Sequence, residues 1–132
     1  MSYGWTEHVG ELELWVEAPD EPGVFADGLR ALGELLGDDA AADAPALFEV
    51  TAVGEDRAVL FAAWLEELSF LAETKGFVPA AIEDLALGRE RIRARVRGRR
   101  GSPPHLVKAV TYHRLGFAPV GDRWRAVAVL DV

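Results

Sequence analysis

The chain has 132 residues, no cysteine and a hydrophobic fraction of 50%, which fits one domain over residues 1–132 that folds without disulfides or a cysteine-ligated zinc. Its 22 acidic and 14 basic residues give a net charge of -8, which argues against a protein that coats nucleic acid on its own. The charge is divided, since residues 1–88 carry 19 acids and 3 bases whereas residues 89–132 carry 3 acids and 11 bases.

The sequence contains no candidate for membrane insertion or secretion. No stretch reaches the roughly 18 to 20 apolar residues that a membrane helix needs. The first eight residues lack the basic and apolar regions of a secretory signal. We therefore expect a cytoplasmic protein.

The first half of the chain predicts two strand-helix pairs. Residues 11–17 alternate apolar side chains with acidic or aromatic ones, which indicates a strand with one buried face. Asp20 marks the start of a helix that ends at Gly37, and residues 39–45 are expected to form a loop. The apolar stripe of this helix is Phe25, Leu29, Leu32 and Leu36. The next strand is predicted at residues 47–53.

The second helix and the remaining strands complete the prediction. Asp56 caps a helix that ends near Gly76 and carries Trp64 on its apolar face. Composition then predicts a hairpin, a loop and two further strands. In chain order these are residues 77–87 and 90–97 for the hairpin, 98–104 for the loop, and 106–115 and 124–132 for the strands.

This order of elements predicts an α+β fold. A strand-helix-strand-strand module is nested inside a second one, whose last two strands come from the C-terminal part of the chain. Helices and strands that segregate in this way pack as two helices on a mostly antiparallel sheet.

The sequence offers little for catalysis. Without cysteine there is no thiol nucleophile, and the histidines His8, His105 and His113 lack the spacing of a zinc protease motif. No glycine-rich phosphate loop or nucleophile elbow occurs. The residues therefore do not predict an enzyme.

One strand carries a row of arginines. At strand spacing, the side chains of residues 91, 93, 95 and 97 point to one face, and those of Ile92, Ala94 and Val96 to the other. A row that includes Arg93 and Arg95 suits phosphates or an acidic partner. The more ordinary interpretation, which we prefer, is a solvated edge strand that charge protects from aggregation.

The last strand ends in acidic groups. Asp131 is followed by Val132, so a side-chain carboxylate and the chain-end carboxylate adjoin. Adjacent anions at the end of a buried strand need water or a hard cation such as Ca²⁺ or Mg²⁺. Composition does not choose between the two.

Four segments together resemble the archease family. Residues 107–113, VKAVTYH, are similar to a family signature, and residues 124–132 are similar to the family's last strand. Residues 7–11, EHVGE, occupy the place of the family's E-H-T-A-D, and residues 64–68, WLEEL, resemble the W-L-N-E-L of its second helix.

The resemblance implies the nested fold and an accessory role. Archeases assist an RtcB-type RNA ligase in tRNA splicing and RNA repair by promoting ligase guanylation and turnover. They bind a divalent cation, usually calcium. The family's ligand positions fall on Glu11, Asp131 and a main-chain or terminal oxygen of Val132, with Glu11 in place of the family's aspartate.

The same resemblance suggests further contact residues. His8, Lys108 and His113 lie within the motifs and are candidates for contact with the ligase, although each histidine is equally a core group that bonds a backbone carbonyl. Lys108 is expected in a strand with its side chain toward solvent or a partner.

Two functional hypotheses remain alongside the preferred one. An archease-fold module without metal would hold RNA or an acidic protein through the arginine strand. A metal-dependent hydrolase is disfavoured, because no positioned base can be named.

Overall fold

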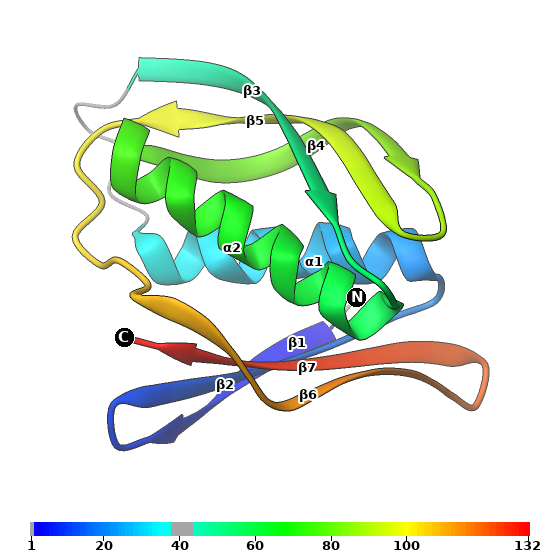
Figure 1. Ribbon diagram of the computed structural model, residues 1–132. Helices are drawn as coiled ribbons and strands as arrows, with labels where there is room; N and C mark the ends of the chain where they lie inside the picture. The colour runs from blue at the N-terminus through cyan, green and yellow to red at the C-terminus, as the bar shows by residue number, and fades with distance from the viewer. Residues whose placement is uncertain (1, 38–43) are drawn as a thin grey trace.

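The computed structural model describes residues 2–37 and 44–132, and these residues form two helices and seven strands. Every strand pair is antiparallel, which confirms the predicted α+β class. The strands divide between two sheets rather than forming one. The two helices lie between the sheets, so the molecule has three layers (Figure 1).

The four-stranded sheet joins the two ends of the chain. Its strand order is β1-β2-β7-β6, so the N-terminal hairpin lies beside the C-terminal one. This is the outer of the two nested modules that the order of elements predicted. The strands are β1 (Ser2–His8), β2 (Glu11–Ala18), β6 (Ala109–Val120) and β7 (Arg123–Asp131).

Strand β1 is absent from the predicted elements. Only Tyr3 and Trp5 give it an apolar face, and they alternate with small or polar residues. Both aromatic side chains pack against the core, on the same face of the sheet as their partners Val16 and Leu14 in β2. Two aromatic residues in a segment of seven are a weak strand signal, and the pairing with β2 supplies the rest of the stability.

The three-stranded sheet corresponds to the inner module. Its strand order is β3-β5-β4, so β5 is the central strand and the interpretation of the arginine row as an edge strand is wrong. The predicted hairpin of β4 and β5 is present. The strands are β3 (Ala44–Val53), β4 (Phe77–Leu87) and β5 (Arg91–Arg100).

Several predicted boundaries differ from the structure. The loop expected at residues 98–104 begins after Arg100, because β5 continues its pairing with β3 and β4. The strand expected at residues 106–115 spans Ala109–Val120, so Lys108 precedes it and the strand continues five residues further than predicted. Of the loop expected at residues 39–45, the first five residues lie outside the described residues, and the last two belong to β3.

Both helices begin and end as their capping residues predict. In α1 (Glu21–Leu36), Asp20 accepts a hydrogen bond from the Gly23 amide at 2.8 Å. In α2 (Arg57–Lys75), Asp56 accepts one from the Val59 amide at 2.9 Å, and Gly76 ends the helix in the left-handed conformation, with φ of 65°. Neither helix is long and apolar enough to cross a membrane.

The core fills the space between the two sheets. Trp64 of α2 is fully buried and donates its indole N–H to the carbonyl of Phe25 in α1 at 3.0 Å. This confirms the core interpretation of Trp64. The hydrogen bond ties the two helices together at the centre of the middle layer, which leaves the outer faces of both sheets available for function.

Candidate functional site

The two ends of the chain meet on the outer face of the four-stranded sheet. Strand register pairs Glu11 of β2 with Asp131 of β7, and His8 of β1 with Glu11. Side chains paired across neighbouring strands project to the same face. Leu14 and Leu130 occupy the opposite face and are fully buried against the helices. His8, Glu11 and Asp131 therefore form one row that faces away from the core, which we call the acidic row.

A bulge in β6 brings a cation to this row. The register between β6 and β7 shifts between Thr111 and Gly116, and Arg114 within that stretch has a φ of 59°. The Arg114 guanidinium lies 3.2 Å from Glu13 and 3.7 Å from Glu11. Because β7 separates β6 from β2, the side chain crosses β7, and Val129 on that face is fully buried. Arg114 is a site residue that the sequence analysis missed, since no pattern signals the bulge.

Main-chain hydrogen bonds fix the position of Asp131. Its carbonyl accepts a hydrogen bond from the Lys108 amide at 2.8 Å. The amide of Val132 donates to the carbonyl of Gly10 at 3.3 Å. The VKAVTYH segment and the β1–β2 turn therefore hold the end of β7 from both sides.

The donors suit a hard cation by type but are few. Calcium takes about six to eight oxygen ligands, and the row offers two carboxylates. Among residues 2–37 and 44–132, no three histidine, aspartate or glutamate side chains gather closely enough to hold a metal. Main-chain carbonyls and water would have to complete a calcium shell. Thr111 lies on the same face of the sheet, two residues beyond Ala109, the register partner of Asp131. Its hydroxyl oxygen is buried and has no hydrogen-bond partner among these residues.

Sequence comparison assigns the family. The profile of the Archease protein family (MTH1598/TM1083) matches residues 3–132. The chain belongs to the archease family. The protein archease of Methanopyrus kandleri is 29% identical over 142 residues, with both chains covered completely. The archease of Pyrobaculum neutrophilum is 24% identical over 139 residues, which span 98% of this chain and 95% of that one.

Solved structures share the archease fold. The solution structure of Methanobacterium thermoautotrophicum protein 1598 has a TM-score of 0.74 at 22% identity, covering 98% of each chain. A crystal structure from Thermotoga maritima, described as an archease and possible chaperone, has a TM-score of 0.70 at 17% identity. It covers 96% of this chain and 94% of that one.

The archease motif residues mostly gather at one end of the four-stranded sheet. His8 and His113 are exposed, so neither is a core group. Lys108 is also exposed, and its main chain touches the acidic row through Asp131. His8 is thus the register partner of Glu11, and the main chains of Lys108 and Val132 lie next to Asp131 and the β1–β2 turn.

The arginine row of this archease lies elsewhere. Arg93 and Arg95 project from β5 on the outer face of the three-stranded sheet, and the helical layer separates them from the acidic row (Figure 1). Arg93 pairs with Glu49 at 3.1 Å, and Arg97 pairs with Glu83 at 3.3 Å. Exposed pairs of this kind contribute little to stability, but they neutralise part of the charge.

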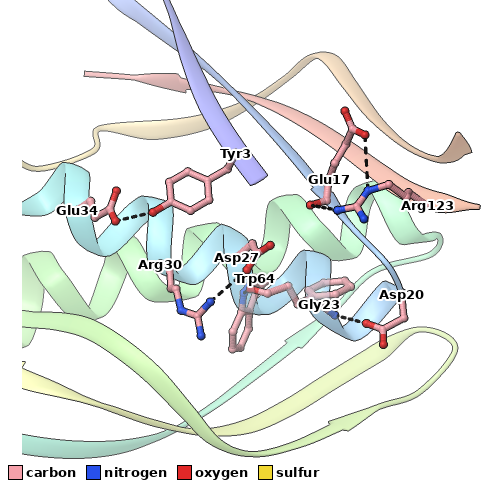
Figure 2. A network of polar contacts seen from close by, with 10 residues as sticks. Tyr3, Glu17, Asp20, Gly23, Asp27, Arg30, Glu34, Trp64 and Arg123 are labelled. Carbon is pink, nitrogen blue, oxygen red and sulfur yellow. Dashed lines mark hydrogen bonds and ion pairs between the residues drawn. The ribbon is translucent and has the colours of Figure 1, made fainter. Parts of the chain in front are cut away.

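A third polar group lies on α1 (Figure 2). Asp27 is fully buried, and only one of its carboxylate oxygens has a partner among the described residues, the Arg30 guanidinium at 3.4 Å. Burial raises the pKa of Asp27. The hydroxyl of Tyr3 donates to Glu34, and burial together with that hydrogen bond raises the pKa of Tyr3 to about 12. This network ties β1 to α1.

Proposed function

We propose that this archease is an accessory protein that activates an RtcB-type RNA ligase by promoting its guanylation and turnover in tRNA splicing or RNA repair. The proposal rests first on family membership. The Thermotoga maritima relative is described as a possible chaperone, a role that also requires a partner protein. The expected location is the cytoplasm.

The acidic row carries the proposal. Motif residues from opposite ends of the chain, Glu11 and Asp131, are direct partners in the β2–β7 register. Paired carboxylates on a solvent-facing surface repel each other and gain nothing for the fold. Their placement there supports a functional role, because a surface selected only for stability would avoid the pair.

The proposed cofactor is a divalent cation, with calcium as the first candidate. Glu11, Asp131 and a main-chain or terminal oxygen of Val132 would hold it, since all three supply the hard oxygens that calcium prefers. Such an ion would neutralise the facing carboxylates and present positive charge to an anionic group. In its absence, Arg114 partly offsets the same charge through its pair with Glu11.

An accessory role fits the acidic row. Its two carboxylates supply the hard oxygen donors that bind a cation, and the row faces away from the core, where a partner can reach it. The residues therefore suit binding to a partner or an ion, and the guanylation chemistry belongs to the ligase.

Guanylation of the ligase tests the proposal. Purified RtcB-type ligase from the same organism is incubated with labelled GTP and divalent metal, with and without this archease. We expect a higher rate of ligase labelling and repeated rounds of RNA joining when the archease is present. Unchanged labelling and joining would refute the activator role.

A second candidate function follows from the arginine row. Arg91, Arg93, Arg95 and Arg97 are all exposed on one face of β5, about 7 Å apart for alternate residues of a strand. This face would hold RNA or an acidic protein without metal. Reversal of Arg93 and Arg95 to glutamate should then abolish RNA retention at low salt. Retention equal to that of wild type would reject this candidate.

A further inference from the structure

A groove runs between α2 and the segment that leads into β6. Its volume is about 510 Å³. Phe70 lies in it with 58% of its surface exposed, next to the nearly buried Val107 and Val110. The groove thus has an apolar floor with one aromatic side chain that is more than half exposed. We call it the α2–β6 groove.

The rim of the α2–β6 groove is acidic. Glu66, Phe70 and Glu73 are four and three positions apart and share one face of α2, and Glu67 adjoins them. All three glutamates line the groove, against a single lysine, Lys108. Burial raises the pKa of Glu66, and the neighbouring Glu67 adds to the effect. A cationic partner would relieve this repulsion.

The groove adjoins the main chain of the last strand. Lys108 and Ala109 line the groove. The amide of Lys108 bonds the carbonyl of Asp131, and Ala109 is the register partner of Asp131. A segment bound in the groove would therefore lie beside the strand end that carries Asp131.

We propose that the α2–β6 groove binds a basic amphipathic segment of the ligase. Lysine or arginine side chains of that segment lie over the three glutamates, and an apolar side chain packs on Phe70. Charge complementarity selects this occupant, because an acidic rim repels RNA phosphates. The inference rests on the proposed function, since it takes the ligase as the partner.

Two groove variants and two matched controls test the proposal. Glu66→Lys/Glu73→Lys reverses the rim, and Phe70→Ala removes the exposed ring without changing charge. The controls are Glu55→Lys/Asp122→Lys, with the same change in charge at exposed sites outside the groove, and Val120→Ala, which truncates another exposed apolar side chain. Thermal unfolding establishes that each variant is folded.

The Kd for the purified ligase is measured by isothermal titration, in parallel with ligase labelling by GTP. We expect each groove variant to raise the Kd about tenfold or more, as loss of a central contact does, and each control to stay within about twofold of wild type. Added salt should weaken the wild-type complex more than the rim-reversed one.

The possible results separate the two proposals. If wild type neither binds the ligase nor stimulates labelling, the proposed function is wrong. If wild type stimulates labelling and both groove variants bind like wild type, the groove proposal is wrong while the function stands. A concentration-dependent dimer of wild type that the groove variants lose would assign the groove to a second copy of the chain, and would also overturn the proposal.

Discussion

Glu11 and Asp131 illustrate how a site can oppose the stability of its own sheet. The two carboxylates are direct cross-strand partners, and like charges in that position destabilise a sheet by up to about 1 kcal/mol. Arg114 offsets part of this cost, since its guanidinium lies 3.7 Å from Glu11 and 3.2 Å from Glu13. A bound cation would offset the remainder.

Asp131→Asn should therefore raise the melting temperature in the presence of a chelator, by the equivalent of up to about 1 kcal/mol. Calcium should raise the melting temperature of wild type, because an ion that binds only the folded state stabilises it. The variant should not respond. Glu55→Gln, which removes an exposed carboxylate far from the row, is the control. A wild-type melting temperature indifferent to millimolar calcium would contradict the metal site.

Asp27 makes the stability of the fold dependent on pH. Burial holds the pKa of this carboxyl above its usual value, so between the two values the folded state binds more protons than the unfolded state. The stabilisation that comes from the protonated Asp27 carboxyl is therefore complete below the pKa of the unfolded state. It is lost as the pH rises through the higher pKa of the folded state.

Asp27→Asn removes this titration. We expect the unfolding free energy of the variant, relative to wild type, to increase as the pH is raised from about 4 to 7. Urea unfolding at several pH values measures the difference. A difference that stays constant over this range, or that falls with rising pH, would show that burial does not govern the protonation of Asp27.

At the scale of elements, the end of α2 depends on a glycine for two separate reasons. Gly76 has a φ of 65°, and a Cβ placed on it would lie 2.2 Å from the carbonyl oxygen of Gly101. Gly121, in the turn between β6 and β7, has a φ of 63° with nothing within 4 Å of such an atom. A comparison of Gly76 with Gly121 therefore separates the cost of the backbone conformation from the cost of the close contact.

Gly121→Ala should cost about 1 to 2 kcal/mol, the price of a left-handed conformation. Gly76→Ala should cost about 1 to 3 kcal/mol more, because the methyl group also forces the main chains of residues 76 and 101 apart. Chemical denaturation of both variants measures the two costs. Equal destabilisation would show that the main chain at Gly101 moves away from the added methyl group without loss of stability.

The helices were predictable from sequence because their signals are local. Capping by Asp20 and Asp56, apolar stripes and the terminal Gly76 all lie within the elements that they define. The division of the strands into two sheets, and the central place of β5, depend on long-range pairing that periodicity does not contain. For the same reason β1 escaped prediction, since its partner β2 supplies much of its stability.

Part of the candidate site was likewise predictable from sequence, and part depends on the folded structure. The position of Glu11 opposite Asp131 is consistent with motif positions at the two ends of the chain. Arg114 enters through a bulge whose geometry leaves no mark in the sequence. Phe70 and Lys108 both line the α2–β6 groove. They are far apart in the sequence, and only the packing of α2 against β6 brings them together.

At the scale of the whole molecule, three surfaces have different chemistry. The helices lie between the two sheets (Figure 1). The outer face of the four-stranded sheet carries the acidic row, and the outer face of the three-stranded sheet carries the arginines of β5. The α2–β6 groove opens between α2 and the segment that leads into β6. Lys108 and Ala109 line the groove and lie beside the main chain of Asp131. The two proposals together predict that one partner protein contacts both surfaces.

The most direct test of the central claim is ligase turnover with the acidic row neutralised. Multiple-turnover RNA joining by the RtcB-type ligase is measured with wild type, with Glu11→Gln/Asp131→Asn, and with Glu55→Gln as the control. We predict that wild type and the control raise turnover and that the double variant, although folded, does not. Stimulation by the double variant equal to that of wild type would contradict a role for the acidic row.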